Sequence, residues 1–181
     1  MTSFDLSVKE LLDRFGGRYM RYCDDILLIV PVSRRRSVIQ EVEELIKRSM
    51  LSINEKKTGI HTFRSRGLGV AKADKPLQYL GFTFDGDTIL IRSAALARYS
   101  QRMKKGVRLA KATMRRWNKI RSVQGGPEHL LYKRSLYQKY SHFGRQNFLR
   151  YGYRAADILE SPAIRGQLKP LWHRLQDELS K

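Results

Sequence analysis

Two adjacent aspartates, Asp24 and Asp25, are the strongest candidates for chemistry, and they stand in the stretch GRYMRYCDDILLIVPV. Side-by-side carboxylates repel each other unless a cation lies between them. Mg²⁺ prefers carboxylate oxygens, and two-metal phosphoryl transfer uses such ligands to hold the attacking and leaving oxygens in line. The alternative is that both aspartates only form a turn, which is a common role for aspartate.

The elements that must position this pair read as a small α+β unit. RYMRY (18–22) and ILLIV (26–30) are β-rich runs that flank a polar tip of two or three residues, which predicts a hairpin. Apolar residues then recur at helical spacing over 33–50, which predicts an amphipathic helix covering the sheet. LSIN and GIHTF indicate short extended pieces around EKKT, and LQYLGFTF with TILIR predicts a second hairpin with its turn at Asp85-Gly86.

Beyond residue 92 the pattern is wholly helical. Ser93 is the expected N-cap of a long helix that QGGP ends at 124–127. Pro127 suits the first turn of the next helix, which is expected to bend at Gly144. Pro162 and Gly166 indicate a break before a last helix over roughly 167–180. We expect two domains: 1–92, with antiparallel hairpins and a covering helix, and 93–181, which is all helical.

Charge is the most informative bulk property. The chain has 36 Lys and Arg against 17 Asp and Glu, a formal net charge of +19, and residues 93–154 hold 16 Lys and Arg with Glu128 as their single acid. Phosphates would offset the self-repulsion of this block, which favours a nucleic-acid partner over an ordinary solvated surface. Eight basic residues of the long helix are predicted to contact a nucleic-acid backbone: Arg98, Arg102, Lys105, Arg108, Lys111, Arg115, Arg116 and Lys119.

Composition excludes several other classes of protein. No run approaches the ~18 apolar residues of a membrane span, and the start of the chain lacks the apolar region of a secretory signal, so we expect a cytoplasmic protein with no membrane partner. Cys23 is the single cysteine, and the four histidines show no metal-ligand spacing. A disulfide framework and a zinc site are therefore not expected.

The stretch RYCDDILLI resembles the Tyr-x-Asp-Asp signature of reverse transcriptases, in which a β-hairpin of the palm carries catalytic aspartates. Two later segments occur in the order that this family uses: LSINEKKTGI is similar to the next palm motif, and LQYLGFTF resembles the primer-grip hairpin. The basic helical remainder looks like a thumb. Its ending, FLRYGYRAADILESPAIRGQLKPLW, is similar to bacterial reverse transcriptases of the retroelement and phage-defence groups.

This resemblance implies a partial polymerase palm and an RNA-directed DNA polymerase that works by two-metal nucleotidyl transfer. Asp24 would be the main ligand of Mg²⁺, with Mn²⁺ as an alternative, and Asp25 would help to hold the metal or its partner groups. Tyr22 would lie close to the nucleotide and the primer end, or else pack under the helix. Lys57 would assist the departure of pyrophosphate as a general acid, although a solvated pair with Lys56 is nearly as good an interpretation.

The resemblance also implies a primer grip made by Tyr79, Leu80, Gly81 and Phe82, and the alternative is an ordinary hairpin with Leu80 and Phe82 facing the core. The implied partners are an RNA template, a DNA primer and product, and a dNTP substrate. Aromatic residues interleaved with basic ones farther along could stack on bases, although most such sets at helical spacing are core: Tyr132, Tyr137, Tyr140, Phe143, Phe148, Tyr151 and Tyr153.

The family pattern also includes fingers and an earlier palm strand with another metal-binding aspartate. Asp5 in SFDLS is a weak candidate for that aspartate, because residues 6–23 leave no room for the segment that the family places between the two strands. SVKELLDRF is expected to form a short surface helix instead. We expect the C-terminal part of a reverse transcriptase that depends on an N-terminal half or partner subunit, in a mobile element or in antiviral defence. The alternatives are a non-catalytic nucleic-acid-binding module with a vestigial palm, and a basic assembly subunit.

Overall fold

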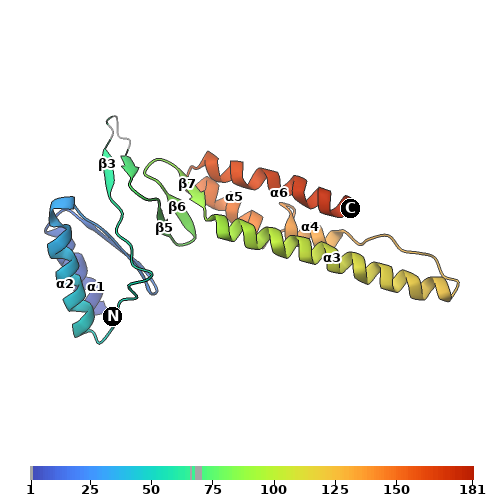
Figure 1. Cartoon of the computed structure of the whole chain (residues 1–181), viewed down its shortest axis with the longest axis horizontal. Coiled ribbons are helices and arrows are strands. Elements are labelled where there is room, and N and C mark those ends of the chain that lie inside the picture. The colour runs from blue at the N-terminus through green and yellow to red at the C-terminus, as the bar shows by residue number, and fades with distance from the viewer. Residues whose placement is uncertain (1, 66, 68–70) are drawn as a thin grey trace. The chain divides into compact units, whose positions relative to one another are not determined.

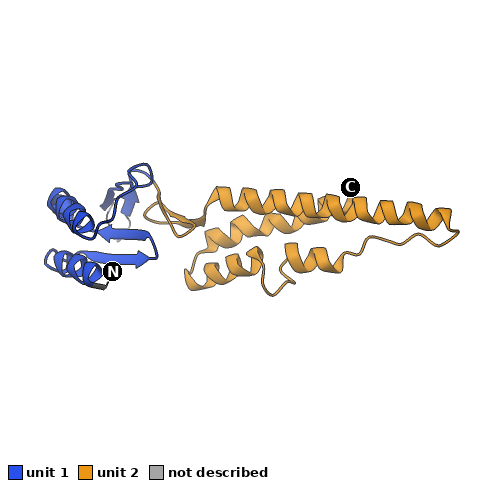
Figure 2. Cartoon of the chain, turned by 90° about the horizontal axis from the view of Figure 1, so that it is seen from below, with its two compact units in different colours: residues 1–75 blue, residues 76–181 orange. Residues whose placement is uncertain are grey.

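The structure is a computed structural model that describes residues 2–65, 67 and 71–181. Six α-helices and three small antiparallel sheets occur within these residues (Figure 1). The α+β class expected from the sequence is therefore confirmed. The chain divides into two compact units, residues 1–75 and residues 76–181, which Figure 2 shows in different colours.

The N-terminal unit is built around the hairpin that was expected at the aspartate pair. Tyr22 is the register partner of Asp25, so Cys23 and Asp24 form a two-residue turn between antiparallel strands. The elements of this unit are α1 (Thr2–Asp13), β1 (Arg18–Tyr22), β2 (Asp25–Ile29), the 3₁₀ helix η1 (Val32–Arg34), α2 (Arg35–Arg48), β3 (Phe63–Ser65) and β4 (Ala71–Ala73).

Helices α1 and α2 cover one face of hairpin β1–β2. Side chains on a strand alternate between two faces, and Tyr19, Ile26 and Leu28 point to the side that the helices cover. The covering helix predicted after residue 33 is α2, and the expected short helix is the end of α1, which begins at Thr2. The buried helical residues are Phe4, Val8, Leu11, Leu12, Val38, Val42 and Ile46.

The segment after α2 differs from the expected extended pieces. Residues 51–60 are all exposed and form no strand. The backbone N–H groups of Lys57 and Thr58 both donate to the carbonyl of Asn54, which makes a turn there. A short strand does follow as β3, but it pairs with β4 in a hairpin that the sequence did not indicate. Each of these strands has three residues, too few to show a clear alternation.

The C-terminal unit begins with a three-stranded antiparallel sheet of β5 (Leu77–Tyr79), β6 (Phe82–Phe84) and β7 (Ile89–Ile91). The expected turn near Asp85-Gly86 is present between β6 and β7. LQYLGFTF, however, is two strands and not one, because the chain reverses at Leu80-Gly81. Both turn residues have positive φ, 47° and 89°, which is the sign pattern of a type I′ hairpin turn.

The helical part contains α3 (Ser93–Val123), α4 (Arg134–Tyr140), α5 (Phe148–Ile158) and α6 (Pro162–Ser180). The long helix is confirmed as α3, although its N-cap is Arg92 and not Ser93. Pro127 does not begin a helix, and the bend expected at Gly144 is a non-helical break over 141–147. Pro162 opens the last helix, which passes through Gly166 without a break.

Asn118 of α3 holds the segment that returns along this helix. Its buried side chain donates to the carbonyl of His129 at 2.9 Å and accepts from the backbone N–H of His129 at 3.0 Å. These bonds satisfy both backbone polar groups of His129, which lies in a non-helical segment. No helix in the described part of the chain combines the length and the apolar character that a membrane span requires.

The sheet β5–β7 packs with the helices that follow it. Ile91 is buried with Tyr99, Leu149, Leu168 and other residues of α3, α5 and α6. The side chain of Gln167 pairs with both backbone groups of Ile91, accepting from its N–H at 2.8 Å and donating to its carbonyl at 3.0 Å. The sequence pattern changes near residue 92, whereas the boundary between the two compact units falls between residues 75 and 76 of the chain.

Candidate functional site

The turn between β1 and β2 has an unusual backbone. Cys23, its first residue, has a φ of 53°, whereas Asp24 does not have a positive φ. A positive φ at the first central position alone is the sign pattern of a type II′ turn, which normally has glycine there. A side chain at that position costs conformational energy, so the turn is held by its surroundings.

Both aspartates present their side chains to solvent at this turn. Asp24 is the second turn residue and Asp25 is the first residue of β2, so the two carboxylates occupy different positions of the hairpin. Both residues are exposed, and neither side chain makes a hydrogen bond or ion pair with a described residue. The pair is therefore accessible to a ligand.

Tyr22 lies on the same face of the hairpin as Asp25, its register partner. This is the face turned away from α1 and α2, and Tyr22 is 62% exposed. The alternative that Tyr22 packs under the helix is therefore wrong. Met20 and Ile29 belong to the same face and are also exposed.

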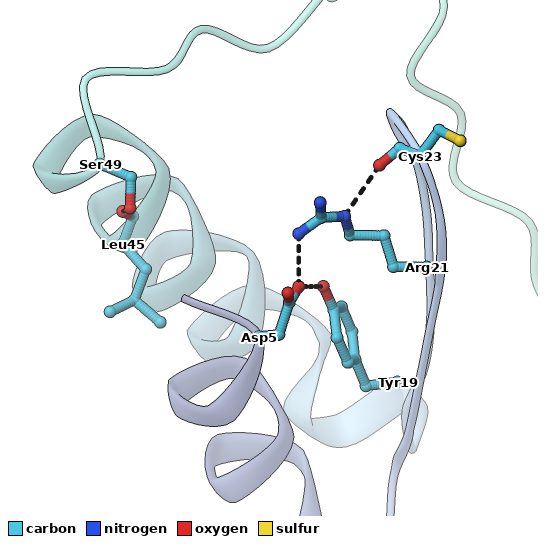
Figure 3. A network of polar contacts seen from close by, with 6 residues as sticks. All are labelled: Asp5, Tyr19, Arg21, Cys23, Leu45 and Ser49. Carbon is cyan, nitrogen blue, oxygen red and sulfur yellow. Dashed lines mark hydrogen bonds and ion pairs between the residues drawn. The ribbon is translucent and has the colours of Figure 1, made fainter. Parts of the chain in front are cut away.

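A polar network connects this turn to helix α1 (Figure 3). The Tyr19 hydroxyl and the Arg21 guanidinium both donate to one oxygen of Asp5, each at 2.6 Å. The Nε of Arg21 also donates to the carbonyl of Cys23 at 2.8 Å. Arg21 thus joins the carboxylate on α1 to the backbone of the turn that carries Asp24. Sequence reasoning considered Asp5 only as a weak metal ligand and missed this contact.

The network shifts the pKa values of its members in opposite directions. The hydrogen bond from Tyr19 is the main cause that lowers the pKa of Asp5 below its usual 3.8, and Arg21 lowers it further by hydrogen bonding and charge. Burial is the main cause that raises the pKa of Tyr19 to about 12, and the Asp5 carboxylate adds to that shift. Asp5 is therefore held as a carboxylate that accepts hydrogen bonds from two donors, so its role here is structural.

The aspartate pair fits part of a metal site. Asp24 and Asp25 offer the oxygens that Mg²⁺ prefers, but nowhere in the described residues do three or more acidic, histidine or cysteine side chains gather closely enough to hold a metal ion. Asp5 lies in a helix and is occupied by Tyr19 and Arg21. The described residues thus supply two carboxylates, and further ligands would have to come from another group.

Lys57 lies in the exposed segment that follows α2. Its backbone N–H donates to the carbonyl of Asn54 at 2.9 Å, and its side chain makes no ion pair with a described residue. Lys56 beside it is equally exposed. The structure brings neither lysine into contact with the aspartates, so the expected general-acid role stays a prediction.

The four residues expected to form a primer grip surround the turn between β5 and β6. Tyr79 and Phe82 are register partners, and Leu80 and Gly81 are the turn itself. Leu80 is 40% exposed and does not face the core, whereas Phe82 packs against the cluster that contains Ile91. The alternative of an ordinary core-facing hairpin therefore holds for Phe82 and is wrong for Leu80.

Seven of the eight basic residues predicted to contact a nucleic-acid backbone are exposed on α3. The buried residues Met103 and Val107 define the opposite side of this helix. Lys111 differs, because it is half-buried and donates to the carbonyl of Glu178 at 2.8 Å. The basic face consists of the exposed seven: Arg98, Arg102, Lys105, Arg108, Arg115, Arg116 and Lys119.

An open groove lies beside the basic face, with a volume of about 440 Å³. Lys104, Lys105 and Arg108 line it from α3, together with Gln101, and Glu178 lines it from α6. Sequence reasoning missed Lys104, because the helical spacing alone did not show where α6 would lie. Three cations against one carboxylate make this groove suitable for an anion.

The comparison with known proteins adds no assignment. A scan against models of protein families finds no match to the chain, and a search of curated proteins finds none either.

We predict that Tyr19→Phe raises the pKa of Asp5 toward 3.8, because the Tyr19 hydroxyl is the main cause that lowers it. The pKa can be followed by NMR titration of the Asp5 carboxyl carbon. A depressed pKa stabilises the fold above the unfolded value, and this stabilisation is lost as the pH falls through the folded value. The free energy of unfolding should therefore depend less on pH below about 4 in Tyr19→Phe than in the parent chain.

Tyr22→Phe is the matched control, since the exposed Tyr22 loses the same hydroxyl without a described partner. Equal pKa values of Asp5 in the two variants would contradict the network.

We predict that Cys23→Val lowers the free energy of unfolding by about 1–2 kcal/mol, because a β-branched residue tolerates a positive φ poorly. Cys23→Gly should be at least as stable as the parent chain, since glycine adopts this conformation freely. Urea unfolding measures both changes. Met20→Val, at an exposed strand position, should have little effect. A Cys23→Val chain as stable as the parent would show that the turn is not strained.

Proposed function

We propose that the chain is the C-terminal palm and thumb part of a reverse transcriptase of the bacterial retroelement and phage-defence type. In this proposal it extends a DNA primer on an RNA template by two-metal nucleotidyl transfer. A separate N-terminal half supplies the fingers and the remaining metal ligands. The observation that carries the proposal is the two-residue turn at which Asp24 and Asp25 are exposed and have no hydrogen-bond or ion-pair partner among the described residues.

The geometry of the turn supports a role in holding a metal ion. Carboxylates that were merely turn formers would be expected to bond to nearby backbone N–H groups, as Asp85 does with Asp87 and Thr88. Asp24 and Asp25 make no such bond to a described residue. A bound Mg²⁺ would offset their mutual repulsion and would position the attacking and leaving oxygens of nucleotidyl transfer. Arg21 would hold the turn by its bond to the carbonyl of Cys23.

The face of hairpin β1–β2 that α1 and α2 leave uncovered supports the proposal that a second polypeptide segment binds there. Met20 is 42% exposed and Ile29 is 51% exposed on the face that also carries Tyr22 and Asp25. Apolar side chains gathered on one sheet face commonly mark a surface that another element covers. In the proposal, the N-terminal half lies against this face and brings its own metal ligand to the aspartates.

The basic face of α3 supports the thumb assignment. Its seven cations lie along one helix of 31 residues, about 46 Å long, and the buried residues Met103 and Val107 of this helix pack in a cluster with Leu175 and Leu179 of α6. Such a face can follow the phosphates of a primer-template duplex without reading bases. The exposed turn at Leu80-Gly81 would approach the primer, and Lys57 would protonate the departing pyrophosphate.

A second candidate is a non-catalytic nucleic-acid-binding module with a vestigial palm. It is favoured by the incomplete ligand set, because the described residues bring no third acidic group to Asp24 and Asp25. This candidate shares the basic face of α3 with the first one. The two proposals therefore differ in the role of the aspartates and agree on the partner.

We predict that the purified chain binds a primer-template duplex with a steep salt dependence. Replacing Arg98, Arg102 and Lys105 by Gln should make the negative slope of log K against log salt shallower by roughly 2 to 3, since each lost phosphate contact removes about 0.9 from its magnitude. The control replaces three exposed cations of the N-terminal unit by Gln: Lys9, Arg36 and Lys47. Fluorescence anisotropy measures both. An equal effect of the two triple variants would contradict a specific role of the basic face.

We predict that the chain alone does not extend a DNA primer on an RNA template in Mg²⁺. Co-expression with the N-terminal fingers and palm segment of a bacterial reverse transcriptase should restore extension, and Asp24→Asn should abolish it by removing a metal-binding charge. Asp13→Asn, an exposed acid on α1, is the control and should leave extension unchanged.

The outcomes separate the two candidates. A complemented Asp24→Asn chain that extends primers as well as the parent would favour the non-catalytic module. Extension by the chain alone, lost in Asp24→Asn, would show that no N-terminal half is required.

A further inference from the structure

Four aromatic rings gather on the C-terminal unit around the break between α4 and α5. The centroid of Phe143 lies 4.2 Å from that of His142, 5.7 Å from that of Trp172 and 6.3 Å from that of Tyr137. Trp172 also lies 5.1 Å from His142 and 5.9 Å from Tyr137. We call these four residues the aromatic platform. They come from α4, the loop 141–147 and α6.

Phe143 and His142 are the exposed members of the platform, whereas Tyr137 and Trp172 are partly buried. Phe143 is 64% exposed, although three other rings lie next to it. Tyr140 and Phe148 by contrast pack against the buried clusters, as aromatic residues at helical spacing commonly do. Leaving a phenyl ring in water forgoes the free energy of burying it, which is why an exposed ring within a cluster indicates a binding surface.

The loop that carries Phe143 is held rigidly. The buried Ser141 hydroxyl donates to the carbonyl of Tyr137 at 2.6 Å and accepts from the N–H of Phe143 at 3.2 Å. Asn147 donates to the carbonyls of Gln138 at 2.9 Å and Ser141 at 2.7 Å. A Cβ on Gly144 would lie 1.9 Å from the carbonyl oxygen of Gln138, so this close turn accepts glycine alone. The ring is therefore placed before any ligand arrives, which lowers the entropic cost of binding.

The charges near the platform indicate the class of ligand. Six Lys and Arg and no acidic residue lie between Glu128 and Asp157. Lys139 lies in the last turn of α4, and Arg145 follows Phe143 in the loop 141–147. Both residues are exposed. Lys169 lies one helical turn before Trp172. An exposed aromatic ring among cations suits a nucleobase whose flanking phosphates are negatively charged.

We propose that the aromatic platform binds single-stranded nucleic acid by stacking a base on Phe143, with Trp172, Tyr137 and His142 as the supporting rings. Stacking does not depend on which base is present, so the platform holds a strand without reading its sequence. The choice of nucleic acid as the ligand rests on the proposed function. The platform is distinct from the basic face of α3, because a duplex keeps its bases stacked inside and has none to offer.

The test measures binding of an oligothymidylate and of an abasic oligonucleotide of the same length. The fluorescence of Trp172 can report binding, since its ring lies next to Phe143. Trp117→Phe removes the fluorescence of the other tryptophan. Phe143→Ala should weaken binding of the oligothymidylate roughly 5- to 150-fold, the value of one base stack. Phe143→Tyr should retain binding, because a phenol ring stacks equally well. The parent chain should bind the abasic strand as weakly as the Phe143→Ala variant binds the oligothymidylate.

Leu130→Ala is the matched control, since Leu130 is 94% exposed and lies in the same acid-free stretch as Phe143. This variant should bind the oligothymidylate like the parent chain. Circular dichroism checks that Phe143→Ala is folded.

Equal binding of the base-bearing and abasic strands by the parent chain would overturn the platform. Salt-dependent duplex binding and Asp24-dependent primer extension do not involve Phe143, so their success or failure is separate from this result.

Discussion

Side chains alternate between the two faces of hairpin β1–β2, and helices α1 and α2 cover one of these faces. Tyr19, Arg21, Ile26 and Leu28 point to the helices, so Tyr22 and Asp25 must point away from them. A shift of β2 by one residue against β1 would bring Asp25 under the helices and move Ile26 and Leu28 into solvent. The burial of a few aliphatic side chains thus determines the exposure of the candidate site, and Asp5 strengthens the same register by its bonds to Tyr19 and Arg21.

The C-terminal unit depends on polar side chains that satisfy backbone groups where regular structure stops. Gln167 pairs with both backbone groups of Ile91, and Ser161 donates to the carbonyl of Ile89 at 2.8 Å. These bonds cover the edge of β7, which would otherwise be free to pair with another strand. Asn118 does the same for the segment that returns from α3. The aromatic platform has its own support of this kind in Ser141 and Asn147.

The predictable parts of the fold are those with many residues of one period. Val38, Val42 and Ile46 mark α2, and Tyr99, Met103 and Val107 mark α3, because several turns repeat the same spacing. The β1–β2 hairpin could be predicted from two β-rich runs around a short polar tip. The strands β3 and β4 could not be predicted, because three residues carry no period. The last helix begins before the expected residue 167, because Pro162 is a residue of its first turn and does not break it.

The candidate site was predictable in its residue types and not in its contacts. The pair Asp24 and Asp25 was visible in the sequence, whereas the link from Asp5 through Arg21 to the carbonyl of Cys23 depends on how α1 packs. In the same way, helical spacing showed seven aromatic residues near the C-terminus but could not tell that Phe143 is exposed while Tyr140 and Phe148 pack inside.

The position of Cys23 has a practical consequence for spectroscopy. It is the single cysteine of the chain and is exposed at the hairpin turn. A maleimide dye or nitroxide therefore attaches to one sulfur atom, which lies one residue from Asp24, without any engineered cysteine. The unmodified sequence thus carries a reporter position for distances from the turn to a labelled oligonucleotide or to a paramagnetic ion.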